Sequence, residues 1–237
     1  MAVDRVPLAE AGTTEAGSPE ASQTGDPLAD APRRGRGRPR GTGRIDPASI
    51  VNAALDALAD GGYRSLSMRG VAREVGVSLA TIQHHYPTKD ALWRAAIDHL
   101  TDDAIERRSH VELTDLTGKI AVFLEQAAGR PGLLPAVLAD RSPGSAERIE
   151  YLTERFTDAM AEPSERLRSL EAAGLTRQFD HRALFALITI GVGSIAGAAD
   201  AVKSIYGFDL ATERGRNELA HGLGDIIGLG VLRRSPR

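Results

Sequence analysis

The chain has 237 residues, enough for one large domain or two small ones, and its 42% hydrophobic and 26% charged content is typical of a globular protein. It contains no cysteine, which excludes a disulfide framework, thiol catalysis and a cysteine-based zinc site. The net charge is −3, and no signal-peptide segment is visible at the N-terminus, so we expect a cytoplasmic protein.

The charges are distributed unevenly along the chain. Residues 1–32 carry six acidic residues and one arginine, a net charge of −5, and show no apolar period, so we expect an acidic, disordered tail. Residues 33–92 carry ten basic and five acidic residues, a net charge of +5, and the rest of the chain is again negative. A positive segment between two negative ones is typical of a region that binds nucleic acid.

Residues 33–44 form a basic arm with six arginines and no acidic residue. Its centre, Arg36-Gly37-Arg38-Pro39, matches the core of an AT-hook, in which two arginines enter a narrow A/T-rich minor groove. Arg40 and Arg44 are expected to add phosphate contacts and salt dependence. A generic basic tail is the alternative.

The first helix is predicted to begin at residue 47 and to end at Gly61-Gly62. Asp46 is a favourable N-cap and Pro47 suits the first helical position. Apolar residues at helical spacing give this helix one buried face, formed by Ile50, Val51, Ala54, Leu55 and Leu58.

Two short helices with a tight turn between them follow. Ser67 is expected to cap the second helix and Ser78 the third, and Gly76 supplies the left-handed residue that a sharp turn needs. A short turn holds two helices at a fixed angle, so the third helix can protrude into the major groove of DNA. The pattern predicts a helix-turn-helix, with an ordinary helical hairpin as the alternative.

The outer face of the third helix carries the candidate base contacts. Thr81 and Gln83 have groups that can bond to base edges or phosphates, and glutamine pairs with adenine in bidentate fashion. Leu79 or Ala80 is placed to touch a thymine methyl group. Tyr86 fits a core aromatic better than a DNA contact, although both remain open.

Lys89 stands at the start of a fourth helix, predicted near residues 89–108. A cation at that end opposes the helix dipole, whereas a bound phosphate would be held by the lysine and the free N–H groups together. We therefore expect a phosphate contact. A solvated lysine compensated by Asp90 is the alternative.

The remainder also shows helical periodicity and no strand-type alternation of useful length, so the predicted fold class is all-α. Residues 45–104 are expected to form an N-terminal three-helix DNA-binding domain, and residues 105–237 a C-terminal helical bundle. Within that bundle, segments are predicted at 133–140, 144–161 and 164–173, followed by two long apolar helices near 181–204 and 211–232.

Other functions find little support in the sequence. His84 and His85 are adjacent and so point about 100° apart on a helix, which disfavours a metal site. The glycines from Gly191 to Gly197 imitate a dinucleotide-binding loop but lack a preceding strand, so close helix packing is the better interpretation. The uncharged run 183–199 is short and rich in Gly and Ala for a membrane span. We expect no enzyme activity, cofactor or membrane partner.

The helix-turn-helix stretch also carries a family resemblance. Residues from Asp46 to about Leu100 resemble the TetR family of transcriptional regulators. The stretch is similar in the Leu66-Ser67-Met68-Arg69 start, in the segment from Val71 to Ser78, and in Thr81-Ile82 followed by His85-Tyr86-Pro87-Thr88-Lys89-Asp90-Ala91-Leu92.

The resemblance implies a homodimer whose subunits pair through the last two helices. It also implies that Thr81, His85 and Lys89 contact DNA. The chain departs from the family at Ala80, where glycine is usual, and at Gln83, where tyrosine is frequent, so Gln83 is hypothesised to read bases instead of phosphate. The full set of predicted DNA-binding residues is Arg36, Arg38, Arg40, Arg44, Ser67, Arg69, Ser78, Leu79, Ala80, Thr81, Gln83, His84, His85, Tyr86 and Lys89.

Members of the family often enclose an effector pocket in the C-terminal domain. In this chain Phe123, Tyr151, Phe156 and Phe185 are candidates to line it, with Arg130 or Arg141 as polar contacts. We therefore expect a homodimeric repressor that binds a palindromic operator in double-stranded DNA and is released by a small-molecule effector. The alternative is an effector-independent or architectural DNA-binding protein that relies on the basic arm.

Overall fold

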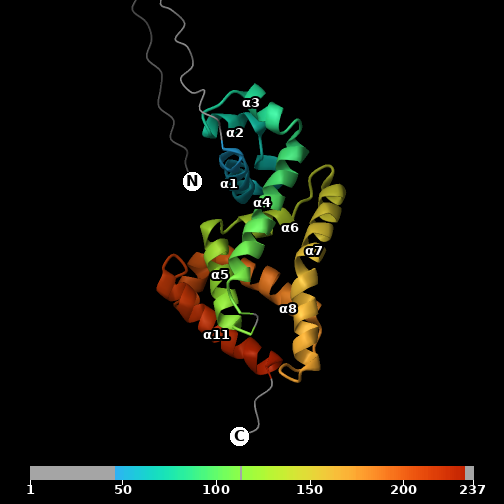
Figure 1. The fold of residues 1–237 in the computed structure, drawn as a ribbon. Helices are drawn as coiled ribbons and strands as arrows, with labels where there is room; N and C mark the ends of the chain where they lie inside the picture. The colour runs from blue at the N-terminus through green and yellow to red at the C-terminus, as the bar shows by residue number, and fades with distance from the viewer. Residues whose placement is uncertain (1–45, 113, 233–237) are drawn as a thin grey trace, which may run out of the picture. The chain divides into compact units, whose positions relative to one another are not determined.

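The computed structural model describes residues 46–112 and 114–232, which form the all-α structure that the sequence predicts (Figure 1). Within these residues, β-type pairing is limited to an isolated bridge between Thr176 and Leu232. The helices in chain order are α1 (Pro47–Ser65), α2 (Met68–Glu74), α3 (Leu79–His85), α4 (Lys89–Ser109), α5 (Leu116–Gly129), α6 (Leu133–Leu138), α7 (Ser145–Ala172), α8 (His181–Ala186), the π-helix η1 (Leu187–Val192), α9 (Gly193–Gly197), α10 (Ala199–Tyr206) and α11 (Glu213–Val231).

The helices of the N-terminal part begin at the expected caps. The Asp46 carboxylate accepts a hydrogen bond from the backbone N–H of Ala48 at 3.0 Å, and Pro47 is the first helical residue. The hydroxyl groups of Ser67, Ser78 and Thr88 each accept from the backbone N–H three residues later, at 3.3, 3.1 and 3.0 Å. Each cap satisfies a donor that the helix itself leaves unpaired, which fixes the start of the helix.

The break expected at Gly61-Gly62 is present inside the range of α1, where both glycines have non-helical dihedral angles. Gly62 has a φ of +67°, which L-residues rarely adopt. A Cβ atom at Gly62 would also lie 3.0 Å from the carbonyl oxygen of Ala136 in α6. The glycine therefore permits both the turn of the backbone and the close approach of α6 to α1.

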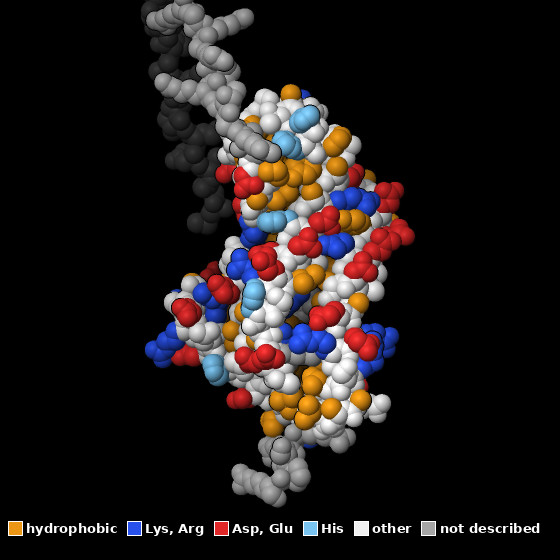
Figure 2. All heavy atoms as spheres, in the orientation of Figure 1, with side chains coloured by type: hydrophobic (Ala, Val, Ile, Leu, Met, Phe, Trp, Pro, Cys, Tyr) orange, Lys and Arg blue, Asp and Glu red, His pale blue; other side chains and the backbone are white. Residues whose placement is uncertain are grey.

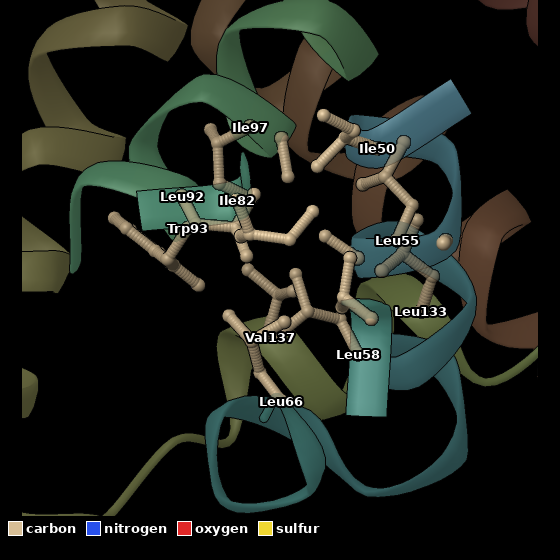
Figure 3. Close-up of a cluster of buried hydrophobic side chains, with 14 of the residues drawn as sticks. Ile50, Leu55, Leu58, Leu66, Ile82, Leu92, Trp93, Ile97, Leu133 and Val137 are labelled. Carbon is tan, nitrogen blue, oxygen red and sulfur yellow. The ribbon is translucent and has the colours of Figure 1, made fainter. Parts of the chain in front are cut away.

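The N-terminal helices share one apolar core with α6 and α7 (Figure 3). Burial of this cluster supplies the main force that holds α1 to α4 together, because each buried aliphatic side chain contributes roughly 1.5–3 kcal/mol. The core therefore links the expected DNA-binding part directly to helices of the C-terminal part. Its residues include Ile50, Leu55, Leu58, Leu66, Ile82, Leu92, Trp93 and Ile97 from the N-terminal part, with Leu133, Val137 and Leu152 from α6 and α7.

A second apolar cluster is centred on α5, which packs against α11, α9, η1 and α4. Ile120 and Leu124 of α5 and Ala220 of α11 are fully buried in it. Gly224 of α11 lies against Thr117 of α5, where a side chain would clash, so these two helices approach closely. α5 thus forms the centre of the C-terminal part.

The prediction of two separate segments at 144–161 and 164–173 is wrong. α7 is one helix of 28 residues that runs through Pro163. Proline has no amide hydrogen to donate within the helix. The hydroxyl of Ser164 nevertheless donates to the carbonyl oxygen of Met160 at 2.6 Å, and Leu152 and Leu167 are buried on either side of the proline. Packing along the helix outweighs the local tendency to break.

The long helix expected near 181–204 is also corrected, because it divides into α8, η1, α9 and α10. The segments His181–Gly197 and Ala199–Tyr206 are bent by 84° at Ala198. The glycines serve close packing, as expected, because a Cβ atom at Gly197 would lie 3.0 Å from the carbonyl oxygen of Pro131 and one at Gly193 would clash with Leu134. Over the described residues, no single helix is both long and apolar enough to cross a membrane. The two bent segments reach the required length and apolar character only when they are taken together.

Candidate functional site

The turn between α2 and α3 is held by local bonds. Gly76 has a φ of +73°, and the N–H of Val77 donates to the carbonyl oxygen of Ala72 at 2.8 Å. Beyond the turn, the Ser78 and Thr81 hydroxyls lie 2.9 Å apart, in addition to the cap that Ser78 forms. These bonds fix the direction of α3 relative to α2, as a helix-turn-helix requires.

α3 presents its predicted contact residues on one side and its anchor on the other. Ile82 is fully buried in the core, while Ala80, Gln83, His84 and His85 are exposed. Among the described residues, the side chains of Gln83, His84 and His85 form no hydrogen bond with protein atoms. Figure 2 shows histidine side chains gathered at this end of the molecule. The polar groups of α3 are therefore available to an external partner.

The other predicted contacts of this part have mixed exposure. Ser67, Arg69 and Ser78 are exposed, and Leu79 and Thr81 are half-buried. Tyr86 is half-buried and packs against the N-terminal core, and burial raises the pKa of its phenol. The structure therefore supports the core interpretation of Tyr86, while a DNA contact of this residue stays a prediction.

Lys89 lies beside a cluster that the sequence did not predict. Its Nζ sits 4.0 Å from the centre of the Tyr63 ring, and the guanidinium of Arg148 lies 3.5 Å from the same centre. Asp90 does not pair with Lys89: it accepts from the hydroxyl of Tyr63 at 2.7 Å and from Arg148 at 3.4 Å. Burial, followed by the charge of Arg148, lowers the pKa of Lys89.

The Arg148 side chain is only 5% exposed and comes from α7, whereas Lys89 and Asp90 begin α4. Arg148 also donates to Asp140 at 2.8 Å and to Ser142 at 2.6 Å. Sequence reasoning missed this cluster because its members are up to 85 residues apart, from Tyr63 to Arg148, and no short motif joins them. It connects the first turn of α4, where a phosphate contact is expected, to α7.

A cavity of about 260 Å³ lies farther along α4. Of the predicted effector contacts, Phe123, Phe156 and Arg130 line it, while Phe185 lines a neighbouring cavity of about 330 Å³. Tyr151 lines neither of these two cavities, so an effector contact of this residue stays a prediction. Its hydroxyl donates to Asp98 at 2.6 Å, and its ring packs on Trp93.

Two further predictions concern charged residues. Arg141 is exposed and its guanidinium donates to the carbonyl oxygen of Asp140, so it does not reach the first cavity.

The arm residues Arg36, Arg38, Arg40 and Arg44 lie outside the described residues, as does the tail 1–32. Within the described ranges, no three histidine or acidic side chains gather closely enough to hold a metal ion.

Known regulators match the part of the chain that holds the helix-turn-helix. Residues 50–96 match the model of bacterial regulatory proteins of the tetR family. The transcriptional regulator UidR of Escherichia coli K12 is 26% identical over 125 residues, which cover 46% of this chain and 64% of UidR. The match therefore spans slightly less than two thirds of the length of this relative.

Solved structures share the fold. A transcriptional regulator from Rhodococcus sp. Rha1 matches 81% of this chain and 100% of its own, with a TM-score of 0.56 and 22% identity. FadR from Bacillus subtilis, solved in complex with stearoyl-CoA, matches 73% of this chain and 96% of its own, with a TM-score of 0.50 and 17% identity. The capped helix-turn-helix and the family match together place residues 50–96 in the TetR family of transcriptional regulators, and the all-α architecture has the fold of these solved structures.

Proposed function

We propose that this protein is a sequence-specific repressor that binds a two-fold symmetric operator in duplex DNA as a homodimer and is released by a small-molecule effector. The observation that carries the proposal is the presentation of α3. Ile82 anchors this helix in the core, while the amide of Gln83 and the rings of His84 and His85 are exposed and unpaired within the described residues. A rigid helix with free polar groups suits the major groove, where base edges carry a full donor and acceptor code.

The exposed apolar surface of the C-terminal part supports dimerisation. Leu187 and Ile190 are 53% and 51% exposed, and Ile226 and Leu229 of α11 are 69% and 58% exposed. On each segment these residues recur at helical spacing with small exposed residues, which gives an apolar stripe. The N–H of Arg177, in the connection before α8, donates to the carbonyl oxygen of Val231 at 2.8 Å, so this connection lies against the end of α11. A second copy of the chain would cover both stripes.

The cavities support release by an effector. α4 supplies Leu100, Ala104 and Arg108 to the lining of the 260 Å³ cavity and begins with Lys89 near the expected DNA surface. A ligand that shifts α4 would therefore alter the position of the DNA-binding helices. FadR, which has the same fold, binds stearoyl-CoA, so this architecture is compatible with a bound small molecule.

Selection of bound fragments from random duplex DNA tests the base-reading role of α3. If Gln83 reads bases, Gln83→Ala lowers affinity for the selected site by roughly 10-fold or more, since a bidentate contact contributes about 1–3 kcal/mol of discrimination. Nonspecific binding should change little. Gln178→Ala, at an exposed glutamine between α7 and α8, is the matched control. An equal loss on all sequences would reject base reading by Gln83.

Deletion of residues 33–44 tests the basic arm. If its arginines contact the minor groove and phosphates, the deletion should weaken DNA binding severalfold or more and flatten the dependence of log Kd on log salt concentration. Fluorescence anisotropy over a salt series measures both quantities. Unchanged affinity and slope would show that the arm is a generic tail.

A further inference from the structure

The charge arrangement in the 260 Å³ cavity indicates the chemical class of its ligand. The cavity is lined by α1, α4, α5, α6, α7 and η1, with Gly193 at the start of α9. On α4, Leu100, Ala104 and Arg108 are spaced by four residues and therefore lie on one stripe of the helix that lines the cavity. Arg108 thus marks one end of the cavity, toward the C-terminus of α4.

The other charged groups of the lining are already compensated. The Nε of Arg107 donates to both carboxylate oxygens of Asp103 at 2.9 Å. Arg130 donates to Asp56 at 2.6 Å and to the side-chain oxygen of Asn52 at 2.9 Å. These pairs compensate the charges of Asp103, Arg107 and Arg130, and His99 is the remaining titratable residue of the lining besides Arg108.

Arg108 lacks the ion pair that Arg107 and Arg130 each form. Across residues 46–112 and 114–232, its guanidinium forms no ion pair and no hydrogen bond, and burial lowers its pKa. Arginine nevertheless stays protonated at neutral pH. Arg108 is half-buried, so its guanidinium is partly desolvated and its hydrogen-bonding groups remain free for a ligand.

A second cation strengthens the positive potential near Arg108. The Nζ of Lys119 donates to the backbone carbonyl oxygens of Arg108 and Val111, at 3.0 and 2.8 Å. Burial, followed by the charge of Arg108, lowers the pKa of Lys119. The nearby Glu162 is paired with Arg166 at 3.2 Å. Lys119 therefore adds a second positive charge close to Arg108.

The side of the cavity that α7 and η1 form is apolar. Phe156, Met160 and Thr189 separate it from the second cavity of about 330 Å³, and no charged residue lines that second space. The ion pair between Arg155 and Asp102, at 2.7 Å, sets Phe156 level with the middle of α4. Arg108 lies six positions after Asp102, so Phe156 and Arg108 are about 9 Å apart along the axis of α4.

We propose that the effector cavity binds a small monocarboxylic acid, with its carboxylate on Arg108 and its apolar tail against Phe156 and Met160. The planar guanidinium matches a carboxylate in bidentate fashion. The volume lies just below the range of roughly 300–1,000 Å³ usual for ligand pockets, which favours a small ligand. The regulatory meaning of this site rests on the proposed function, whereas binding of the acid does not.

Binding to the full chain without DNA tests the proposal. Isothermal titration with straight-chain carboxylates from butanoate to decanoate, and with phenylacetate, identifies the best acid. The alcohol and the amine of the same carbon skeleton serve as neutral and cationic controls. The acid should bind at least about tenfold more tightly than either control, because a charge-assisted bidentate contact is lost in both.

Variants locate the carboxylate. Arg108→Met, which keeps the apolar stem, should lower affinity for the acid about tenfold or more and leave affinity for the alcohol unchanged. Without ligand its melting temperature should equal that of the wild type, because the half-buried guanidinium forms no bond to other described residues, whereas loss of a structural contact would lower it. Arg107→Met, at the neighbouring arginine that is paired with Asp103, should change acid affinity less than threefold.

Four outcomes of these experiments would overturn the inference. Equal binding of acid and alcohol, preference for the amine, no binding by any acid, or undiminished acid binding by Arg108→Met would each contradict it. DNA binding of the ligand-free protein is measured separately on random fragments. Loss of that activity would reject the proposed function, while intact DNA binding with no acid binding would reject only the acid inference.

Discussion

At the scale of single residues, Arg148 shows how a buried charge can connect two parts of the chain. Its side chain donates to Asp140 and Ser142 in the segment before α7 and reaches Asp90 at the start of α4. Burial alone would raise the pKa of Asp140, but hydrogen bonds from Ser142 and Arg148 together lower it below its ordinary value. Caps such as Ser67 and Ser78 were predictable because they act within three residues, whereas this cluster depends on contacts across the whole fold.

Replacement of Arg148 should therefore destabilise the protein. Arg148→Met leaves Asp140, whose side chain is 9% exposed, without its cation, and we expect a loss of about 3–5 kcal/mol in the free energy of unfolding. Urea titration measures it, and Arg182→Met, at a 91% exposed arginine paired with Asp180, is the control with no measurable change. A loss in Arg148→Met no greater than in the control would contradict this account.

The same cluster makes a prediction for acid stability. Because the pKa of Asp140 is lowered in the folded state, its contribution is complete above its ordinary pKa and is lost as the pH falls through the folded value. The wild type should lose stability below about pH 4 more steeply than Arg148→Met. Urea midpoints measured from pH 6 downward would show the difference, and parallel curves would oppose it.

At the scale of elements, two glycines with similar dihedral angles have different surroundings. Gly76 has a φ of +73°, and a Cβ atom added to it would meet nothing within 4 Å, whereas Gly62 has a φ of +67° and faces the Ala136 carbonyl. The sequence indicated both turns, because glycine punctuation is local. It could not show that Gly62 also touches α6, nor that α7 continues through Pro163, since both depend on packing between distant segments.

Alanine at these positions should separate the two effects. Gly76→Ala is expected to cost about 1–2 kcal/mol through the left-handed backbone alone. Gly62→Ala should cost a further 1–3 kcal/mol, roughly the effect of overpacking, because the methyl group presses against α6. Thermal unfolding compares the two variants with the wild type, and equal losses would show that α6 yields without strain.

At the scale of the whole molecule, the proposed dimer would bring two DNA-binding parts into one assembly. The sequence predicted that the last helices pair, but Val202, Leu219, Ile227 and Val231 are buried in the subunit's own core. The exposed stripes instead contain Leu187, Ile190, Ile226 and Leu229. Periodicity alone could not divide the apolar residues between these two surfaces. The cavity was equally out of reach, because several distant helices form its walls.

Ile226→Glu tests this surface, because a charge there would be buried in the proposed interface. We expect dissociation into monomers, seen by sedimentation, and a loss of tight operator binding because one recognition helix would remain. Ile105→Glu, at a 40% exposed isoleucine of α4, is the control and should remain dimeric. A monomeric wild type, or a dimeric Ile226→Glu, would refute this interface.

The most direct test of the central claim is to map the surface that faces DNA. Because the chain has no cysteine, Glu74→Cys, at the end of α2, can carry a single iron-chelate label that cleaves nearby DNA. We predict two cleavage clusters, related by two-fold symmetry, on a fragment selected for tight binding. The same label on Gln178→Cys should cleave little. Equal or stronger cleavage from Gln178→Cys would contradict the assignment of α2 and α3 as the DNA-binding unit.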